Sequence, residues 1–331
     1  MAQAASLAGS VHEPMSTVSS CAPRRRGPGG WSKSRAVVRL VLCLAAVSVL
    51  TFSPSGEARA AARAFGAPAT RRPARGGASS GTEAEQLLAS ARGDAARMRQ
   101  AYSSIKEMAD AKPDDVTLKL RAAEAAVSIM RITGHANSLA CRLSDGGKPE
   151  VQKQDTDANM AVWAEWAPVA HKLLSEAETD LGEAFTKDAS SFILSVEAGM
   201  YATASRGIVA AVLSGKAASF LASVAKLEKL HPEHDSAIYC VYWGAYYLAA
   251  PWPVSSASKA RSYFERLVKR FPASRRNQYF AGVGAFMERD FVAARTYMER
   301  ALEEECASPS ELDVCDWFTA EAKRTLELLR D

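Results

Sequence analysis

Apolar residues between residue 81 and the C-terminus recur every three or four positions, with polar residues between them. Spacings of three, four and seven place side chains on one face of a helix. No segment shows a sustained alternation of apolar and polar residues, and no Asn-Gly or Asp-Gly pair stands between two predicted strands. This pattern predicts an all-α body of about eight to ten helices over residues 81–331.

The clearest helices lie in two predicted hairpins between Ser236 and Ala301. Apolar residues stand five, eight and twelve positions before the residue that ends the second helix of each hairpin. The same spacing precedes four such ends, which are Pro113, Pro232, Pro272 and Cys306. Proline suits this position because it lacks the backbone donor that a continuing helix needs.

The spacing of these ends predicts a solenoid of helical hairpins. Positions 232 and 272 are 40 residues apart, and the next step, to 306, is 34 residues. Periods of this size are typical of stacked helix pairs. The clearest repeats are expected over residues 215–306, and a capping helix is expected over residues 310–329.

The order of small and large residues in these hairpins resembles the tetratricopeptide repeat. The first hairpin matches at Gly244, Tyr247, Ala260, Phe264 and Pro272, and the second matches at Gly282, Ala294 and Ala301. The resemblance implies helices that cross closely at the small residues and a concave groove that binds ligands or peptides. The alternative is an ordinary bundle of α-hairpins without repeat ancestry.

A second resemblance covers about the last third of the chain. The runs 246–253 and 259–267, with the closing helix 317–329, are similar to the T component of bacterial TRAP-type transporters. The resemblance implies an accessory subunit that assists a solute-binding protein. Members of that family are often lipoproteins, whereas Cys43 follows Leu40-Val41-Leu42 without the small residue of a lipobox.

Further helices are predicted upstream of these hairpins. Thr82 and Glu85 form a capping box, so one helix is expected from Glu83 to about Lys112. The other predicted helices begin near residues 116, 158, 190 and 215, with a kink or restart at Pro168. In the apolar helix over residues 190–213, Gly199 and Gly207 suggest the close approach of a neighbouring helix.

The first eighty residues differ in composition from the remainder. They hold 11 Lys or Arg and two acids, so the body carries a net charge of about −5. A mildly acidic body without a basic stripe argues against nucleic acid as a partner. The apolar run 40–52 is short for a membrane span and typical of a signal peptide. Residues 1–80 are therefore predicted to be a largely disordered targeting leader, and no stable transmembrane span is expected in the mature chain.

The leader resembles the bipartite presequence of proteins that enter complex plastids in algae. A basic flank precedes the apolar run, two Ala-Arg-Ala cleavage candidates follow it, and Phe65 opens an Arg-rich stretch without acids. A two-step presequence for the thylakoid lumen fits the same pattern. The alternatives are a secretory or endomembrane signal and an uncleaved anchor.

Candidate catalytic and metal-binding residues are few. His231-Pro232-Glu233-His234 brings two imidazoles and a carboxylate together, but Pro232 prevents the helix that would align them on one face. His171 lies far in sequence from any nucleophile motif, and the sequence holds no phosphate-binding loop, HExxH or CxxC. We expect no enzyme activity, no metal and no cofactor.

Two interpretations of the cysteines remain open. Cys306 and Cys315 flank a loop that contains Pro309, and they are expected to form a disulfide in an oxidising compartment. Alternatively, they are buried thiols, as are Cys141 and Cys240, which is common in helical cores.

Aromatic residues are the best binding candidates, because Tyr and Trp are enriched at interfaces. The main group is Tyr239, Tyr242, Trp243, Tyr246, Tyr247 and Trp252, and a second pair is Trp163 and Trp166. The alternative is that these rings pack between helices. The leading hypothesis is a non-catalytic scaffold that binds a partner protein through an aromatic-lined groove, and the sequence leaves homo-oligomers open.

Overall fold

The computed structural model describes residues 80–134, 141–146, 148–152, 156–207, 210, 214–250 and 253–330. The leader predicted over residues 1–80 lies outside this part except at Ser80, and so does Trp252. Within the described residues there are thirteen α-helices, one 3-10 helix and no strand, with one isolated bridge between Leu143 and Val151. The predicted all-α fold is confirmed.

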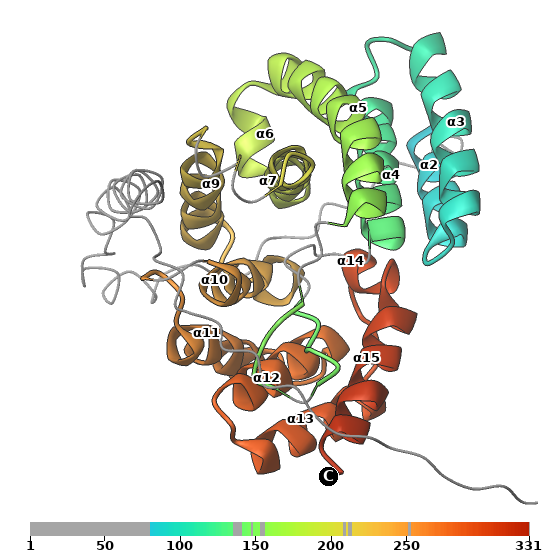
Figure 1. Cartoon of the computed structure of the whole chain (residues 1–331). Coiled ribbons are helices and arrows are strands. Elements are labelled where there is room, and N and C mark those ends of the chain that lie inside the picture. Colours follow the sequence, from blue (N-terminus) through green and yellow to red (C-terminus); the bar gives the residue numbers. More distant parts are fainter. Residues whose placement is uncertain are drawn as a thin grey trace, which may run out of the picture. The chain divides into compact units, whose positions relative to one another are not determined.

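The helices follow one another in chain order (Figure 1). They are α2 (Ser80–Ala91), α3 (Ala95–Ala111), α4 (Val116–Gly134), α5 (Asp157–Leu181), α6 (Glu183–Lys187), α7 (Ala189–Ala204), α9 (Lys216–Leu230), η2 (His234–Ala237), α10 (Ile238–Ala249), α11 (Ala257–Arg270), α12 (Arg275–Met287), α13 (Phe291–Glu303), α14 (Pro309–Leu312) and α15 (Cys315–Leu328). Consecutive helices from α2 to α5 pack against one another, and so do those from α10 to α13.

The single helix predicted from Glu83 to Lys112 is wrong, because the chain breaks between α2 and α3. Gly93 adopts a φ of +76°, which a helix interior does not permit. Asp94 then caps α3, since its carboxylate accepts hydrogen bonds from the backbone nitrogens of Ala96 and Arg97.

The helix predicted over residues 190–213 is also shorter than expected. α7 ends at Ala204, and Gly207 adopts a φ of +79°. Within the described residues, no neighbouring atom lies within 4 Å of a Cβ built at Gly199 or Gly207, so the predicted close approach at these glycines is wrong. By contrast, α5 continues without a restart through Pro168.

The two predicted hairpins between Ser236 and Ala301 are present as α10–α11 and α12–α13. In the first, a Cβ at Gly244 would overlap the ring of Phe264 on the next helix. In the second, a Cβ at Gly282 would lie 2.7 Å from the terminal methyl of Met298. Both glycines therefore allow the close helix crossing that the sequence pattern predicts.

The last predicted helix is divided, because Asp313 and Val314 separate α14 from α15. Asp313 is buried, and its carboxylate accepts hydrogen bonds from Arg92 after α2 and from Arg131 in α4. Figure 1 shows α14 beside α4, although more than 170 residues separate them in sequence. Ion pairs thus join the segment after α14 to α4 and to the residue that follows α2.

None of the described helices combines the length and the apolar character that crossing a membrane requires.

Candidate functional site

Four part-buried aromatic side chains form one cluster on α10 and α11. Trp243 stacks on Tyr247 and Tyr263, with ring centroids 6.4 and 6.2 Å away, and Tyr247 stacks on Tyr263 at 6.0 Å. Tyr246 contacts Tyr247 at 5.5 Å. We call Trp243, Tyr246, Tyr247 and Tyr263 the aromatic surface.

Charged side chains border the aromatic surface. The ammonium of Lys259 lies 5.2 Å from the ring centre of Tyr247, and the guanidinium carbon of Arg266 lies 4.8 Å from that of Tyr263. Glu228 on α9 accepts hydrogen bonds from the indole nitrogen of Trp243 at 3.1 Å and from Arg266 at 3.4 Å. These contacts orient the rings, and cations above aromatic faces add attraction at a partly solvated site.

The hydroxyl groups of the surface stay neutral at physiological pH. Burial raises the pKa of Tyr246 and of Tyr247, and burial together with the nearby Glu228 raises the pKa of Tyr263 to about 12. The three phenols therefore offer neutral hydroxyl groups beside apolar rings, which is the combination enriched at protein interfaces.

Tyr239 and Tyr242 do not belong to this surface. They are 3% and 1% exposed, so packing in the core, and not contact with a partner, accounts for them. Spacings of three and four place both side chains on the same side of α10 as Tyr246, so the helical period does not explain the difference. The contacts of Tyr242 explain its burial, because its ring meets Phe220 on α9 and its hydroxyl meets Glu197 on α7. Burial raises the pKa of Tyr239 to about 12.

Trp163 and Trp166 are core residues as well. Trp163 is 1% exposed and contacts the position where Gly134 lacks a side chain. Trp166 makes an edge-on contact with Tyr102, with ring centroids 5.0 Å apart. The second candidate pair is thus buried between α4, α5 and their neighbours, and it offers no surface for binding.

Tyr263 was not among the predicted candidates, although it directly precedes Phe264, a residue of the repeat pattern. Successive side chains on a helix are about 100° apart around its axis, so Tyr263 does not lie on the buried face that Phe264 occupies. Lys259 and Arg266 lie at spacings of four and three from Tyr263 on the same helix. This spacing of two cations around a tyrosine is the sequence signal that would have identified Tyr263 as a candidate.

A network of buried hydrogen bonds and ion pairs joins α10 to α7, to α4 and to the segment after α14. The hydroxyl of Tyr242 donates to Glu197 at 2.8 Å, and Glu197 pairs with Arg131. Arg131 in turn pairs with Asp313 at 3.0 Å. Since all four side chains are buried, this network fixes α10 relative to α4, α7 and the segment after α14.

The backbone immediately before α10 is strained. Asp235, Ser236 and Ala237 have φ values of 48°, 51° and 61°. Non-glycine residues rarely adopt this left-handed conformation, and three in succession are rarer still. Such strain persists only where the surrounding contacts enforce it, and it is enriched at functional sites.

Contacts from α12 and α14 enforce this turn. Arg276 donates to the carboxylate oxygens of Asp235 at 3.2 Å and to its carbonyl oxygen at 2.5 Å. Asn277 donates to the carbonyl oxygen of Ser236 at 3.3 Å, and Ser310 donates to the carboxylate of Asp235 at 2.6 Å. Burial alone would raise the pKa of Asp235, but Arg276 and the serine hydroxyls lower it to about 2.

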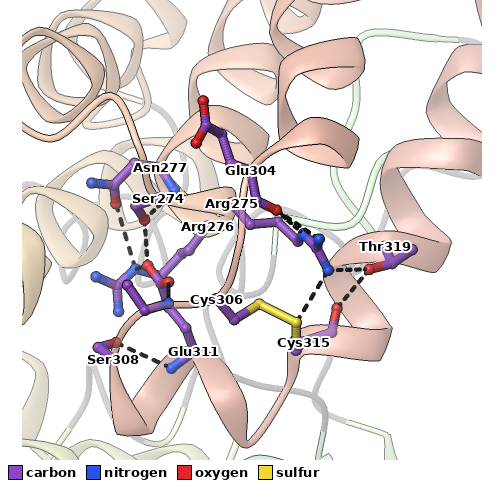
Figure 2. Close-up of a disulfide and its surroundings, with 11 residues drawn as sticks. Ser274, Arg275, Arg276, Asn277, Glu304, Cys306, Ser308, Glu311, Cys315 and Thr319 are labelled. Carbon is purple, nitrogen blue, oxygen red and sulfur yellow. Dashed lines mark hydrogen bonds and ion pairs between the residues drawn. A yellow bond between two sulfur atoms is a disulfide. The ribbon is translucent and has the colours of Figure 1, made fainter.

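Cys306 and Cys315 form a disulfide, which agrees with the first of the two interpretations of the sequence. It joins the segment after α13 to the first residue of α15 (Figure 2). The loop between them carries the buried residues Ser308, Ser310, Glu311 and Asp313. Cys141 and Cys240 are buried elsewhere.

His231 follows α9, and His234 is the first residue of η2. His231 contacts the carbonyl oxygen of Thr186 at 2.9 Å, and burial lowers the pKa of His234. Among the described residues, no group of three His, Cys, Asp or Glu side chains has the arrangement of a metal site.

The chemistry that this region offers is contact by stacked rings, neutral hydroxyl groups and two cations. No model of a known protein family matches the chain, and no curated protein matches it either.

Proposed function

We propose that this chain is a non-catalytic helical-repeat scaffold that binds a partner protein through the aromatic surface. The observation that carries the proposal is the cluster of four part-buried rings on α10 and α11, in which Trp243, Tyr247 and Tyr263 are stacked and Tyr246 is tilted against Tyr247. Large rings gathered at a surface and kept partly in water mark interaction sites.

Repeats of the tetratricopeptide type are part of this proposal. The support is that both hairpins have a glycine on the first helix against a large side chain of the second, Phe264 or Met298. This repeated relationship favours two copies of one unit over an unrelated bundle. The aromatic surface belongs to the first copy.

The charges around the rings indicate the chemistry of the partner. Lys259 and Arg266 are exposed and lie against the faces of Tyr247 and Tyr263. A partner segment with apolar side chains and nearby carboxylates would contact both the rings and the cations. Rim charges of this kind act mainly on specificity and association rate.

The disulfide supports the proposal that the chain works in an oxidising compartment. A plastid compartment of an alga, reached through the leader, remains our proposal, with the secretory pathway as the alternative. Sequencing the N-terminus of the protein from its native cells tests this. A terminus near Ala61, Phe65 or residues 77–82 supports a cleaved leader, and an intact Met1 contradicts it.

The binding proposal is tested by affinity purification of the tagged full-length chain from its native cells, with mass spectrometry of the captured proteins. The test variant combines Tyr246→Ala and Tyr247→Ala. The matched control is Tyr297→Ala, another part-buried tyrosine that packs against the core, on α13. Loss of one interface tyrosine weakens binding by about thirty-fold where it is a hot spot.

Loss of a captured protein from the double variant, with its retention by the control, supports the proposal. Retention by both variants contradicts it. Lys259→Glu provides a second variant that disturbs no buried contact, and weaker capture with unchanged circular dichroism is expected. If the captured protein is a solute-binding protein, the accessory-subunit interpretation of the scaffold is favoured.

A further inference from the structure

The disulfide between Cys306 and Cys315 is within reach of solvent. Both cysteines are only part-buried, whereas Cys141 and Cys240 are 1% and 0% exposed. Exchange between a thiol and a disulfide requires the attacking thiolate to reach one sulfur and the other sulfur to leave as a thiolate. Solvent access therefore permits exchange at this bond, whereas burial protects Cys141 and Cys240.

A fixed positive charge lies beside one of the two sulfurs. The Nη1 atom of Arg275 is 3.1 Å from the Sγ of Cys315 (Figure 2). The same side chain donates to the carbonyl oxygen of Glu304 at 2.6 Å and to the hydroxyl of Thr319 at 2.8 Å, so its guanidinium is held in place. A guanidinium stabilises a neighbouring thiolate, which makes Cys315 the better leaving group.

We propose that Cys306–Cys315 is a redox modification site that a dithiol reductant opens by attack on Cys306. The thiolate of the dithiol forms a mixed disulfide with the Sγ of Cys306, and Cys315 leaves as a thiolate paired with Arg275. The second thiol of the dithiol then attacks the reductant's sulfur in the mixed disulfide, and Cys306 leaves as a thiolate. Two electrons and two protons pass from the dithiol, which becomes a cyclic disulfide, to the two cysteines.

The loop that the disulfide closes is the one that holds the strained turn before α10. Ser310 lies inside it and donates to Asp235, and Glu311 lies inside it and pairs with Arg276 at 3.6 Å. Reduction removes the covalent link across this loop. The contacts from Ser310 and Glu311 that hold residues 235–237 in the left-handed conformation are then weaker, and the turn unfolds locally more often.

The test uses the full-length chain in dithiothreitol, with timed alkylation and mass spectrometry of each cysteine. Cys306 and Cys315 are expected to react while Cys141 and Cys240 stay unmodified, which shows that the chain remains folded. Arg275→Met is expected to slow reduction about three- to ten-fold, and Arg275→Lys is expected to restore most of the rate. The matched control is Arg300→Met, because Arg300 is an exposed cation on α13.

Two further readouts test the direction of attack and its consequence. Incubation with glutathione is expected to leave its mixed disulfide on Cys306. Amide hydrogen exchange in a peptide that covers residues 235–241 is expected to accelerate about ten-fold after reduction, with α3 unchanged. The paired variant Cys306→Ser with Cys315→Ser is expected to reproduce that acceleration without a reductant.

The proposal is overturned if Cys141 and Cys240 react together with Cys306 and Cys315, since reduction then requires unfolding of the helical body. It is also overturned if glutathione labels Cys315 in place of Cys306, or if exchange at residues 235–241 is the same before and after reduction.

Discussion

Arg276 donates hydrogen bonds to both the side chain and the backbone carbonyl of Asp235, 41 residues before it in the sequence. The Arg276 side chain is fully buried, and that of Asp235 is 9% exposed. The pair closes the left-handed turn that begins α10, and α10 carries most of the aromatic surface. The orientation of the surface thus depends on a contact far from it in sequence.

Arg276→Met is expected to lower the free energy of unfolding by about 3 to 5 kcal/mol, because it leaves a buried carboxylate without its counter-ion. Urea denaturation measures this loss. The matched control is Arg270→Met, which removes an ion pair to Glu233 whose carboxylate side chain is 76% exposed. That change is expected to cost less than about 1 kcal/mol. Equal losses for the two variants would refute the structural role of Arg276.

Ser236→Gly is expected to raise the unfolding free energy by about 0.5 kcal/mol, because glycine adopts a φ of 51° without steric cost. Ser236→Val is expected to lower it by more than about 1 kcal/mol, since a β-branched residue fits this conformation poorly. Thermal unfolding of the pair measures the difference. The reverse order would show that the turn is not left-handed in solution.

The stability of the fold is expected to fall in acid through Asp235. Its pKa is lowered from 3.8 to about 2, so the charged carboxylate stabilises the folded state above pH 4. This stabilisation, about 2 kcal/mol, is lost as the pH falls from 4 to 2. Urea titrations of the wild type and Asp235→Asn across this range measure it. The gap between the two proteins should narrow as the pH falls, and a constant gap would contradict the assignment.

Two glycines are expected to respond in opposite directions to alanine. Gly244→Ala should lower the unfolding free energy by about 1 to 3 kcal/mol, because the new methyl group meets the ring of Phe264. Gly199→Ala should raise it by about 0.5 to 1 kcal/mol, because its site is open and glycine weakens a helix interior. Denaturation midpoints of the two variants give the comparison.

The sequence predicts those parts of the fold that depend on local periodicity. The hairpins of α10 to α13 follow from the spacing of Ala260, Phe264 and Leu267 in the first hairpin and of the equivalent residues in the second. Gly244 and Gly282 mark the positions where the helices cross. The break at Gly93-Asp94 also had a local signal, a glycine followed by an N-cap residue. The predicted capping box at Thr82 led instead to one long helix.

The contacts that orient the site are not local, and therefore the sequence pattern does not predict them. Tyr242 pairs with Glu197 across 45 residues, and Asp313 pairs with Arg131 across 182 residues. A period along one helix says which face is buried but not which polar group will meet the hydroxyl. This is why Tyr242 was predicted on the binding surface, although it lies in the core.

Binding of a partner at the aromatic surface is tested most directly by photo-crosslinking in the native cells. A photoreactive phenylalanine analogue replaces Tyr247 in one strain and Tyr297 in another, and the crosslinked products are compared after illumination. We predict a crosslink to a specific partner protein from position 247 that is absent from position 297. The same products from both positions, or none from position 247, would contradict the proposal that this surface binds a partner.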